Sequence, residues 1–290
     1  MPSLGGNQDM TTAITGATGL LGRCIADHLR ATGGIVRAIS TRTPPQSRDL
    51  EGCDAIIHLA GEPVAQRWTV AARERIINSR VDGTRELVKA IGGLTQPPKV
   101  LLNASAIGYY GSRGDEILTE SAGPGNDFLA RVCVEWEREA QEAEKFGVRV
   151  ARLRTSVVLA QNGGALEQML TPFRLGVGGK IGDGRQWMSW IHIDDIAALM
   201  SFILATPALQ GPVNASAPNP VINADFTREL ARVLHRPAIF SVPRLVLKAL
   251  LGEMAQVILA SQRVIPEAAS DAGFEFKFPT IGLALTDLLK

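Results

Sequence analysis

A glycine-rich turn joins the first strand-like run of the chain to its first helical run. Met10–Thr15 is the strand-like run, and Gly16-Ala17-Thr18-Gly19-Leu20-Leu21-Gly22 follows it directly. Beyond the turn, Leu21, Ile25 and Leu29 recur at the spacing of one helix face. Glycines at such a junction permit a tight turn and let backbone N–H groups at a helix N-terminus approach an anion. We therefore expect a strand–turn–helix unit that can bind a pyrophosphate, and so a dinucleotide.

The following residues alternate short β-rich runs with helical periods. Further strands are expected at Ile35–Ile39, Asp54–Leu59, Lys99–Asn103 and Val148–Leu153. Helical stretches separate the strands in three of the four intervals, and the exception is Thr41–Gly52, which contains Pro44-Pro45 and is too short for a full helix. A strand and a helix usual at this point are expected to be missing. The alternation predicts an α/β fold of the Rossmann type, a doubly wound parallel sheet with helices on both faces.

Two long helices have apolar faces that follow from residue spacing. The first is expected to bury Val70, Ile77, Val81, Val88 and Ile91. The second is expected to bury Phe128, Val132, Trp136, Ala140 and Ala143. Its acidic residues are expected to lie mostly on the solvated side, namely Glu135, Glu137, Glu139, Glu142 and Glu144.

The pattern loosens after Leu153, where glycines punctuate a loop-rich region. The expected division has a polar N-terminal extension at 1–9 and a dinucleotide-binding domain at 10–160, to which 187–213 returns. A small C-terminal α/β substrate lobe takes 161–186 and 214–290. The apolar run Leu245–Leu259 is expected to be a core or dimer helix, because Lys248, Glu253 and Gln256 interrupt it too often for a membrane helix.

The residues after the second strand indicate which dinucleotide binds. An acid about 20 residues beyond the glycine turn would bind the ribose 2′-hydroxyl of NAD. Between Asp27 and Asp49 the chain has no acid. Basic and hydroxyl residues stand there instead: Arg37, Ser40, Thr41, Arg42 and Arg48. Because a guanidinium suits phosphate oxygens, Arg42 is expected to pair with a 2′-phosphate, which favours NADP(H). The alternative is a merely solvated Arg42.

Composition excludes several other classes of protein. Apolar residues make up 46% of the 290 residues and the formal net charge is +1, with no block of like charge, so disorder and nucleic-acid binding are not expected. Cys24, Cys53 and Cys133 are scattered, which predicts neither a disulfide framework nor a metal site. The longest apolar stretch, Ile196–Ala205, is about half of the roughly 20 residues that span a bilayer. We expect a cytoplasmic protein with no membrane partner.

Several motifs resemble those of the extended short-chain dehydrogenase/reductases. These are Thr15–Gly22, His58-Leu59-Ala60-Gly61, Arg80-Val81-Asp82-Gly83-Thr84 and Trp190-Ile191-His192-Ile193-Asp194-Asp195. More specific motifs are similar to those of the YfcH-like, sugar-nucleotide-epimerase-like epimerase family proteins. They are Ala60–Pro63, Ser105–Gly111, Gly184–His192 and Val213–Pro220, with C-terminal matches at Leu250–Met254 and Gln262–Pro266. The resemblance covers about Met10 to Lys290.

The resemblance implies an NADP(H)-binding Rossmann domain whose C-terminal lobe closes a substrate cleft. The cofactor-binding residues would then be Gly16, Thr18, Gly19, Leu20, Leu21, Gly22, Ser40, Thr41, Arg42, Leu59, Ala60, Gly61 and Arg80. In the subfamily the arginine after the second strand corresponds to Thr41 here, so Arg42 stands one residue later. Arg80 replaces an asparagine common in the extended family, and it either faces the cofactor or forms a helix-surface ion pair.

The usual catalytic pair of this superfamily is missing. The helix that would carry Tyr-x-x-x-Lys has Phe128 and Val132 at the two positions. The chain's only tyrosines, Tyr109 and Tyr110, follow Ser105 at the carboxyl end of the sheet, where ligands of open α/β folds bind. One hypothesis is that Ser105 binds a substrate oxygen and a tyrosine supplies the proton. The alternative is that Tyr110 packs under the cofactor and Ser105 caps a turn.

Other polar residues are candidates for the substrate cleft or for structural roles. Arg154, Arg185 and Gln186 are expected to line the cleft, where cations would suit a phosphate or carboxylate. His192 is expected to be a core histidine, and Asp194 or Asp195 a helix cap.

Two functions fit this sequence. The first is an NADP(H)-dependent oxidoreductase or epimerase-like enzyme that acts on a small polar carbonyl or sugar-like substrate with an atypical proton donor. The second is a non-catalytic NADP(H)-binding regulatory protein. A homodimer is a further expectation.

Overall fold

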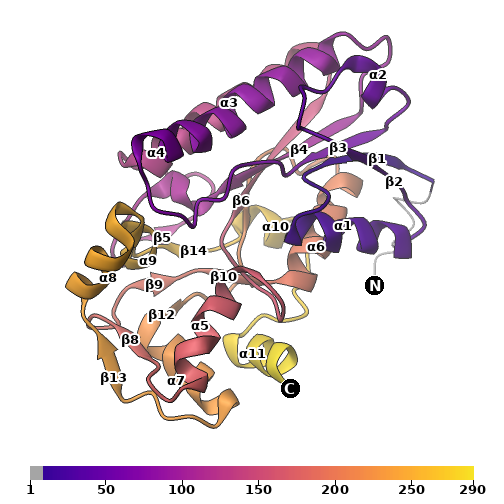
Figure 1. Ribbon diagram of the computed structural model, residues 1–290. Helices are drawn as coiled ribbons and strands as arrows, with labels where there is room; N and C mark the ends of the chain where they lie inside the picture. The colour runs from indigo at the N-terminus through magenta and orange to yellow at the C-terminus, as the bar shows by residue number, and fades with distance from the viewer. Residues whose placement is uncertain (1–8) are drawn as a thin grey trace.

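The computed structural model describes residues 9–290, and at its centre lies a six-stranded parallel sheet (Figure 1). The strands are β1 (Thr11–Thr15), β2 (Ile35–Ile39), β3 (Ala55–His58), β4 (Val100–Ala106), β6 (Arg149–Thr155) and β11 (Gly211–Ala215). Their order is β11-β6-β4-β3-β1-β2, with every neighbouring pair parallel. The predicted fold class is confirmed. Residues 1–8 of the expected polar extension lie outside the described residues.

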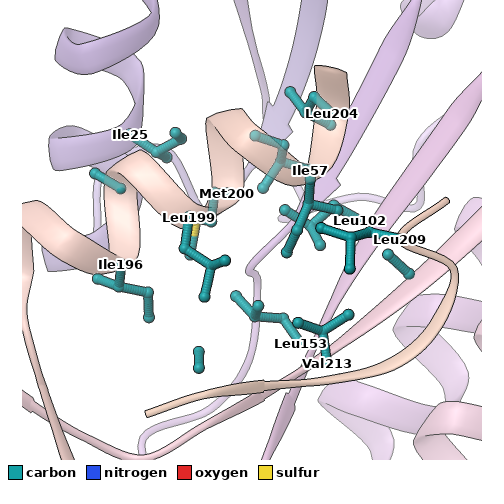
Figure 2. Close-up of a cluster of buried hydrophobic side chains, with 14 of the residues drawn as sticks. Ile25, Ile57, Leu102, Leu153, Ile196, Leu199, Met200, Leu204, Leu209 and Val213 are labelled. Atoms are coloured by element: carbon teal, nitrogen blue, oxygen red, sulfur yellow. The ribbon is translucent and has the colours of Figure 1, made fainter. Parts of the chain in front are cut away.

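Helices cover both faces of this sheet, as a doubly wound fold requires. The helices α1 (Leu20–Ala31) and α6 (Ile193–Ala205) pack together on one face, and α3 (Val70–Gly92) and α4 (Phe128–Gln141) pack together on the other. Neighbouring residues of β3 point to opposite faces, so Ile57 joins the core beneath α1 and α6 while Ile56 joins the core beneath α3 and α4. Figure 2 shows the first of these cores, where Leu199 and Met200 of α6 lie near Leu102 of β4 and Leu153 of β6.

The sheet ends at β2, as the short interval after it predicted. Only α2 (Ser47–Leu50), a single turn of helix, separates β2 from β3. The strand and helix usual at this point are absent from the described residues, and β2 is therefore an edge strand. Thr15 pairs with Ile39 on one side and with His58 on the other, so the carboxyl ends of β2 and β3 flank the glycine turn.

A second, smaller core lies beyond the carboxyl end of the sheet. It contains Trp190, Leu166, Phe226, Leu230 and Leu285. The elements around it are α5 (Gly164–Arg174), β8 (Gly179–Ile181), β9 (Trp187–Met188), β12 (Val221–Ile222), α7 (Asn223–Leu234), β13 (Phe240–Val242) and α11 (Ile281–Leu289). The parallel pair β7 (Val157–Leu159) and β10 (Trp190–His192) joins this lobe to the sheet.

Late residues of the chain also return to the sheet. β14 (Arg263–Val264) pairs with β5 (Ile117–Leu118), and α10 (Glu267–Asp271) packs beside β11. Ala269 of α10 belongs to the larger core. The chain therefore crosses between the two cores several times, and Figure 1 shows the yellow C-terminal segment beside both.

Two expected apolar faces differ from the structure. Val70 at the start of α3 is 76% exposed and Ile77 lies at the surface, whereas Ile76 is fully buried. The other three expected residues, Val81, Val88 and Ile91, are buried, so the expected face holds from the middle of α3 onward and fails in its first turns.

The expected core helix at Leu245–Leu259 is wrong for its first half. This segment forms α8 (Arg244–Leu251) and α9 (Ala255–Leu259), and α8 buries no residue. Leu245 is 79% exposed. Covering of this helix by a second copy of the chain stays a prediction. Among residues 9–290, no helix combines the length and apolarity that crossing a bilayer requires.

Candidate active site

The turn between β1 and α1 is built around two glycines that tolerate no side chain. Gly16 has φ +71°, and a Cβ there would lie 2.9 Å from the backbone N of Ala60. A Cβ at Gly22 would lie 2.1 Å from the carbonyl oxygen of Gly16. The backbone folds back this closely so that α1 can start immediately after the strand.

The first turn of α1 leaves its N–H groups available to an anion. Its N-cap residue is Gly19, which has no side chain to accept a hydrogen bond from the helix, and the first turn has no acidic residue. The helix dipole places partial positive charge at this end. The arrangement fits a pyrophosphate, because the backbone cradle is one that a Cβ would fill.

A cavity of about 520 Å³ extends from this turn across the carboxyl end of the sheet. Six of the expected cofactor residues in and around the turn line it, namely Gly16, Gly19, Leu20, Leu21, Gly22 and Leu59, and so does Arg80. Its far wall holds Ser105, Phe128, Val132, Cys133 and Gln262, among others. Thr18, Ser40, Thr41, Arg42, Ala60 and Gly61 do not line it.

The segment after β2 lies beside the turn and carries a free cation. Ser40, Thr41 and Arg42 follow Ile39, which pairs with Thr15 immediately before the turn. Arg42 is exposed, and its backbone N–H donates to Ser40 Oγ at 3.3 Å. Within residues 9–290 its guanidinium has no ion pair or hydrogen bond, so the charge is available to a phosphate.

Arg80 points from α3 into the cavity wall. Its Nη1 donates to the backbone oxygens of Glu62 at 2.9 Å and Ile76 at 3.3 Å, and its Cζ lies 5.1 Å from the ring centroid of Trp136. Burial lowers the pKa of Arg80. In the part of the chain that the structure describes, Arg80 forms no ion pair, so the alternative of a helix-surface salt bridge is wrong.

A buried hydrogen-bond chain supports this wall from behind. Thr15 Oγ1 lies 2.6 Å from Nδ1 of His58, and Nε2 of His58 lies 3.1 Å from Thr84 Oγ1. Trp136 Nε1 donates to the same Thr84 oxygen at 2.9 Å. Burial lowers the pKa of His58 to about 4, so its imidazole is neutral at pH 7.

Ser105 lies at the cavity, but a buried glutamate holds its hydroxyl. Ser105 Oγ donates to Glu137 Oε1 at 2.7 Å, and Glu137 is 2% exposed. Arg154 binds both oxygens of this carboxylate, through Nε at 2.8 Å and Nη2 at 2.9 Å. Burial works against the charge of Arg154, but the hydrogen bonds and charge of Glu137 outweigh it and raise the pKa of Arg154 above its usual range. The three side chains form one bonded unit beneath the cavity.

This unit corrects two sequence expectations. Glu137 and Glu139 are buried rather than solvated, because arginines from other elements neutralise them. Arg85 of α3 pairs with Glu139, and Arg154 of β6 pairs with Glu137. Arg154 is committed to this pair and does not line the cavity, so it is not a surface cation for a substrate.

The tyrosines lie next to this unit and outside the cavity lining. Tyr110 is fully buried and donates to Asn214 Oδ1 at 2.7 Å, while Nη1 of Arg154 donates to its hydroxyl at 3.0 Å. Burial raises the pKa of Tyr110. The ring centroid of Tyr109 lies 3.5 Å from Arg154 Cζ. The structure thus brings Ser105, but neither tyrosine, to the cavity, and a catalytic role for the tyrosines stays a prediction.

The two other expected cleft residues lie in the lobe, away from the cavity lining. Arg185 is exposed, in the loop between β8 and β9, and its backbone N–H bonds Asp183. Gln186 is buried and donates to the backbone oxygen of Ile181. Neither lines this cavity.

The Trp190–Asp195 motif is structural. His192 is buried against Phe278, with ring centroids 3.8 Å apart, and its Nδ1 accepts from the backbone N–H of Asp194. The histidine is therefore the helix cap instead of an aspartate. Asp195 accepts from the backbone N–H groups of Lys277 and Phe278, which fixes the C-terminal segment.

Aromatic and C-terminal residues of the site were not found from the sequence. Trp68 and Phe128 meet at the cavity with ring centroids 5.1 Å apart, and Arg73 lies 4.9 Å from the Phe128 centroid. Arg73 also pairs with Glu253 of the C-terminal segment. Gln262 lines the cavity and donates to backbone oxygens of the loop after β4. The only available signal was the resemblance at Gln262–Pro266, which gave no position in space.

The parallel sheet, the uncapped glycine turn and the cavity at the carboxyl strand ends define a nucleotide-binding α/β protein of the Rossmann type. Residues 12–215 match the NAD dependent epimerase/dehydratase family, and the chain belongs to that family. Residues 242–288 match a domain of unknown function, DUF1731.

Relatives of the chain carry the same family description. It is 38% identical to the chloroplastic epimerase family protein SDR39U1 homolog of Arabidopsis thaliana, over 97% of this chain and 87% of the relative. It is 36% identical to epimerase family protein YfhF of Bacillus subtilis, over 97% and 98%. A crystal structure of human epimerase family protein SDR39U1 with NADPH superimposes with a TM-score of 0.90 at 31% identity, covering 97% of this chain and 99% of that one.

Proposed function

We propose that this protein is an NADP(H)-dependent oxidoreductase or epimerase-like enzyme that acts on a small substrate. The observation that carries the proposal is a single cavity that begins at the pyrophosphate-type turn and ends at Ser105, Phe128 and the C-terminal segment. The cavity thus joins the turn that would hold a pyrophosphate to the side chains where a second ligand would meet the cofactor. The human relative crystallised with NADPH supports the choice of cofactor.

The residues present divide the work of binding among themselves. The N–H groups at the start of α1 would hold the pyrophosphate, and the free guanidinium of Arg42 would pair with the 2′-phosphate. When bound, NADPH supplies a hydride from its nicotinamide ring. Phe128 and Val132 present apolar surface to the cavity, against which a ligand can pack.

Proton supply decides which substrates suit this cavity. Ser105 directs its proton to Glu137, and burial raises the pKa of the neighbouring Cys133 to about 12. Phe128 and Val132 occupy the positions of the superfamily's proton donor and its lysine, and neither can release a proton. A substrate whose reduced form takes its proton from water suits this cavity better than one that needs an internal acid.

The Ser105 proton, which is bound to Glu137, favours one alternative, a non-catalytic NADP(H)-binding regulatory protein. In that case cofactor binding would stabilise a conformation that a partner recognises. The two proposals differ in turnover: single-turnover oxidation of bound NADPH by small aldehydes, ketones or sugar nucleotides would support the enzyme, and its absence across such a panel would support the regulator.

The first test is the cofactor. We expect NADPH to quench the tryptophan fluorescence of the protein at micromolar concentration and NADH to bind far more weakly, since Trp68 and Trp136 line the cavity. Arg42→Ala should weaken NADPH binding about tenfold or more and leave NADH binding unchanged, because only NADPH carries the 2′-phosphate.

Arg30→Ala is the matched control, since Arg30 is an exposed arginine on α1 whose partner is Asp27. Equal binding of the two nucleotides by the unmodified protein would contradict the NADP(H) proposal. Binding of neither would remove the enzyme proposal as well.

A further inference from the structure

Toward a ligand, the hydroxyl of Ser105 can only accept a hydrogen bond. A serine hydroxyl has one proton and two lone pairs, whereas a carboxylate only accepts. Ser105 Oγ lies 2.7 Å from Glu137 Oε1, so its single proton lies on that bond. What Ser105 offers to the cavity is its lone pairs.

Arg154 fixes this direction. It binds Glu137 in the bidentate geometry, with both partners at most 4% exposed at their side chains. A guanidinium cannot accept a hydrogen bond, so Arg154, like Ser105, can only donate to the carboxylate. Because the pair is buried, releasing Ser105 from Glu137 would leave a buried oxygen short of a donor, which is costly.

Four other polar side chains of the wall also direct their protons into the protein. Their protons bond inside the protein: Ser156 Oγ donates to Ala215 O, Trp68 Nε1 to Val64 O, Trp136 Nε1 to Thr84 Oγ1, and Gln262 Nε2 to the backbone oxygens of Ile107 and Gly111. The donors left for a ligand are therefore the N–H groups at the glycine turn and the side chains of Arg80 and Gln256, whereas Ser105 offers an acceptor.

We propose that Ser105 is a hydrogen-bond acceptor in this cavity, held so by Glu137, and that the site selects a ligand group carrying an O–H or N–H donor at that position. This reverses the expectation that Ser105 donates to a carbonyl oxygen. Glu137 is a positioning residue, because it acts through Ser105 and does not itself line the cavity. The inference shares with the proposed function only the assumption that this cavity binds ligands.

Two ligands can supply such a donor. The carboxamide of the nicotinamide ring carries N–H groups, and a hydroxylated substrate carries an O–H group. Both satisfy the same acceptor, and the experiment separates them.

The first arm measures small apolar probes by titration calorimetry. Naphthol carries an O–H donor, and methoxynaphthalene has the same ring with an acceptor only. Naphthol should bind roughly five- to tenfold more tightly, because one additional hydrogen bond contributes about that much to affinity. Ser105→Ala should remove the preference, and Ser156→Ala should keep it, since Ser156 is another serine of the same wall. This result places the donor on the substrate.

The second arm measures NADPH affinity in the same variants. A loss of about fivefold or more in Ser105→Ala but not in Ser156→Ala places the donor on the dinucleotide. The proposal is overturned if Ser105→Ala changes neither the probe preference nor NADPH affinity, or if methoxynaphthalene binds more tightly. Failure of the unmodified protein to bind NADPH would remove the proposed function alone, because the probe arm does not depend on it.

A third variant tests the role of Glu137. In Glu137→Gln an amide N–H at the Oε1 position would donate to Ser105, while the amide oxygen at the Oε2 position still accepts from Arg154 Nη2 and the bond from Arg154 Nε is lost. The serine proton then turns toward the cavity. The probe preference should then shift toward methoxynaphthalene. If Glu137 had a purely structural role, Glu137→Gln would weaken the binding of both probes equally, and that result would contradict the positioning role. If this variant does not fold, the Ser105→Ala measurement still tests the proposal.

Discussion

At the scale of single residues, burial decides what each polar side chain can do. Ser105, Glu137 and Arg154 come from β4, α4 and β6, and they bond one another beneath the cavity. Removing one member of a buried ion pair leaves the other charge unpaired in a low-dielectric interior. Stability and ligand polarity therefore depend on the same three residues.

Two glutamates on α4 provide a direct comparison. Glu137→Ala should lower the free energy of unfolding by about 3–5 kcal/mol, because Arg154 would be left buried and unpaired. Glu135→Ala should change it by less than about 1 kcal/mol, since Glu135 pairs with Arg138 at the surface of the same helix. Urea denaturation of both variants measures the difference, and similar losses would show that the buried pair is not special.

His58 makes the fold sensitive to acid. Its pKa falls from 6.5 to about 4 on folding because it is completely buried, so the unfolded chain binds more protons between these values. This contribution to stability is complete above pH 6.5 and is lost as the pH falls toward 4, by about 3 kcal/mol. His58→Gln should flatten the pH dependence of unfolding in that window.

His235 is the control for this measurement, because it is exposed at the end of α7. The slope should persist in His235→Gln. An unchanged slope in the His58 variant would show that other groups carry it.

Sequence periodicity could not distinguish these buried polar residues from exposed ones. Glu137 stands on a helix rich in glutamate, beside the expected apolar position Trp136 and not on it, so periodicity assigns it to the solvated side. Its burial depends on Arg154, which stands 17 residues later on another element, and no local pattern reports such a pair. Ser105 was found because it lies at the carboxyl end of a predicted strand, where ligands of open α/β folds bind.

At the scale of elements, local patterns predicted most of the fold. Five strands of the sheet and its missing strand follow from β-rich runs and interval lengths, because parallel strands are buried and bounded by turns. The sixth strand, β11, and the individual elements of the lobe were not predicted from such runs. Helix α8 was expected in a core or a dimer contact and lies exposed in the single chain, since apolar spacing alone does not say what a face will meet.

The turn between β1 and α1 gives the sharpest prediction at this scale. Gly22→Ala should abolish NADPH binding and destabilise the protein, because a Cβ would lie 2.1 Å from the carbonyl oxygen of Gly16. Gly83→Ala is the matched control within α3, where the nearest atom is 4.0 Å away, and it should stabilise the protein by about 0.5–1 kcal/mol. Thermal unfolding and NADPH titration test both, and normal nucleotide binding by Gly22→Ala would mean that the turn is not the pyrophosphate site.

At the scale of the whole molecule, the cavity joins the sheet to the C-terminal segment. Gln256, Val257 and Gln262 line it opposite the glycine turn, and Glu253 pairs with Arg73 at its edge. A ligand in this cavity therefore touches parts of the chain that lie more than 200 residues apart in the sequence.

NADPH at about 100 times its dissociation constant should raise the free energy of unfolding by about 2.7 kcal/mol. Hydrogen exchange should slow both at the start of α1 and at α9, while β13, which is outside the cavity lining, should be unaffected. Protection confined to α1 would show that the C-terminal segment does not contribute to binding.

The order of strands in the sheet also determines how long one strand edge stays unpaired during synthesis. β6 lies between β4 and β11, and its β11 edge stays unpaired until Gly211–Ala215 has been made. From Thr155 to Ala215 the ribosome must add 60 residues, roughly 3–12 s at typical rates. During that interval the unpaired backbone edge of β6 is open to pairing with other nascent chains. Cells that make this protein quickly should need a chaperone most while the lobe is being translated.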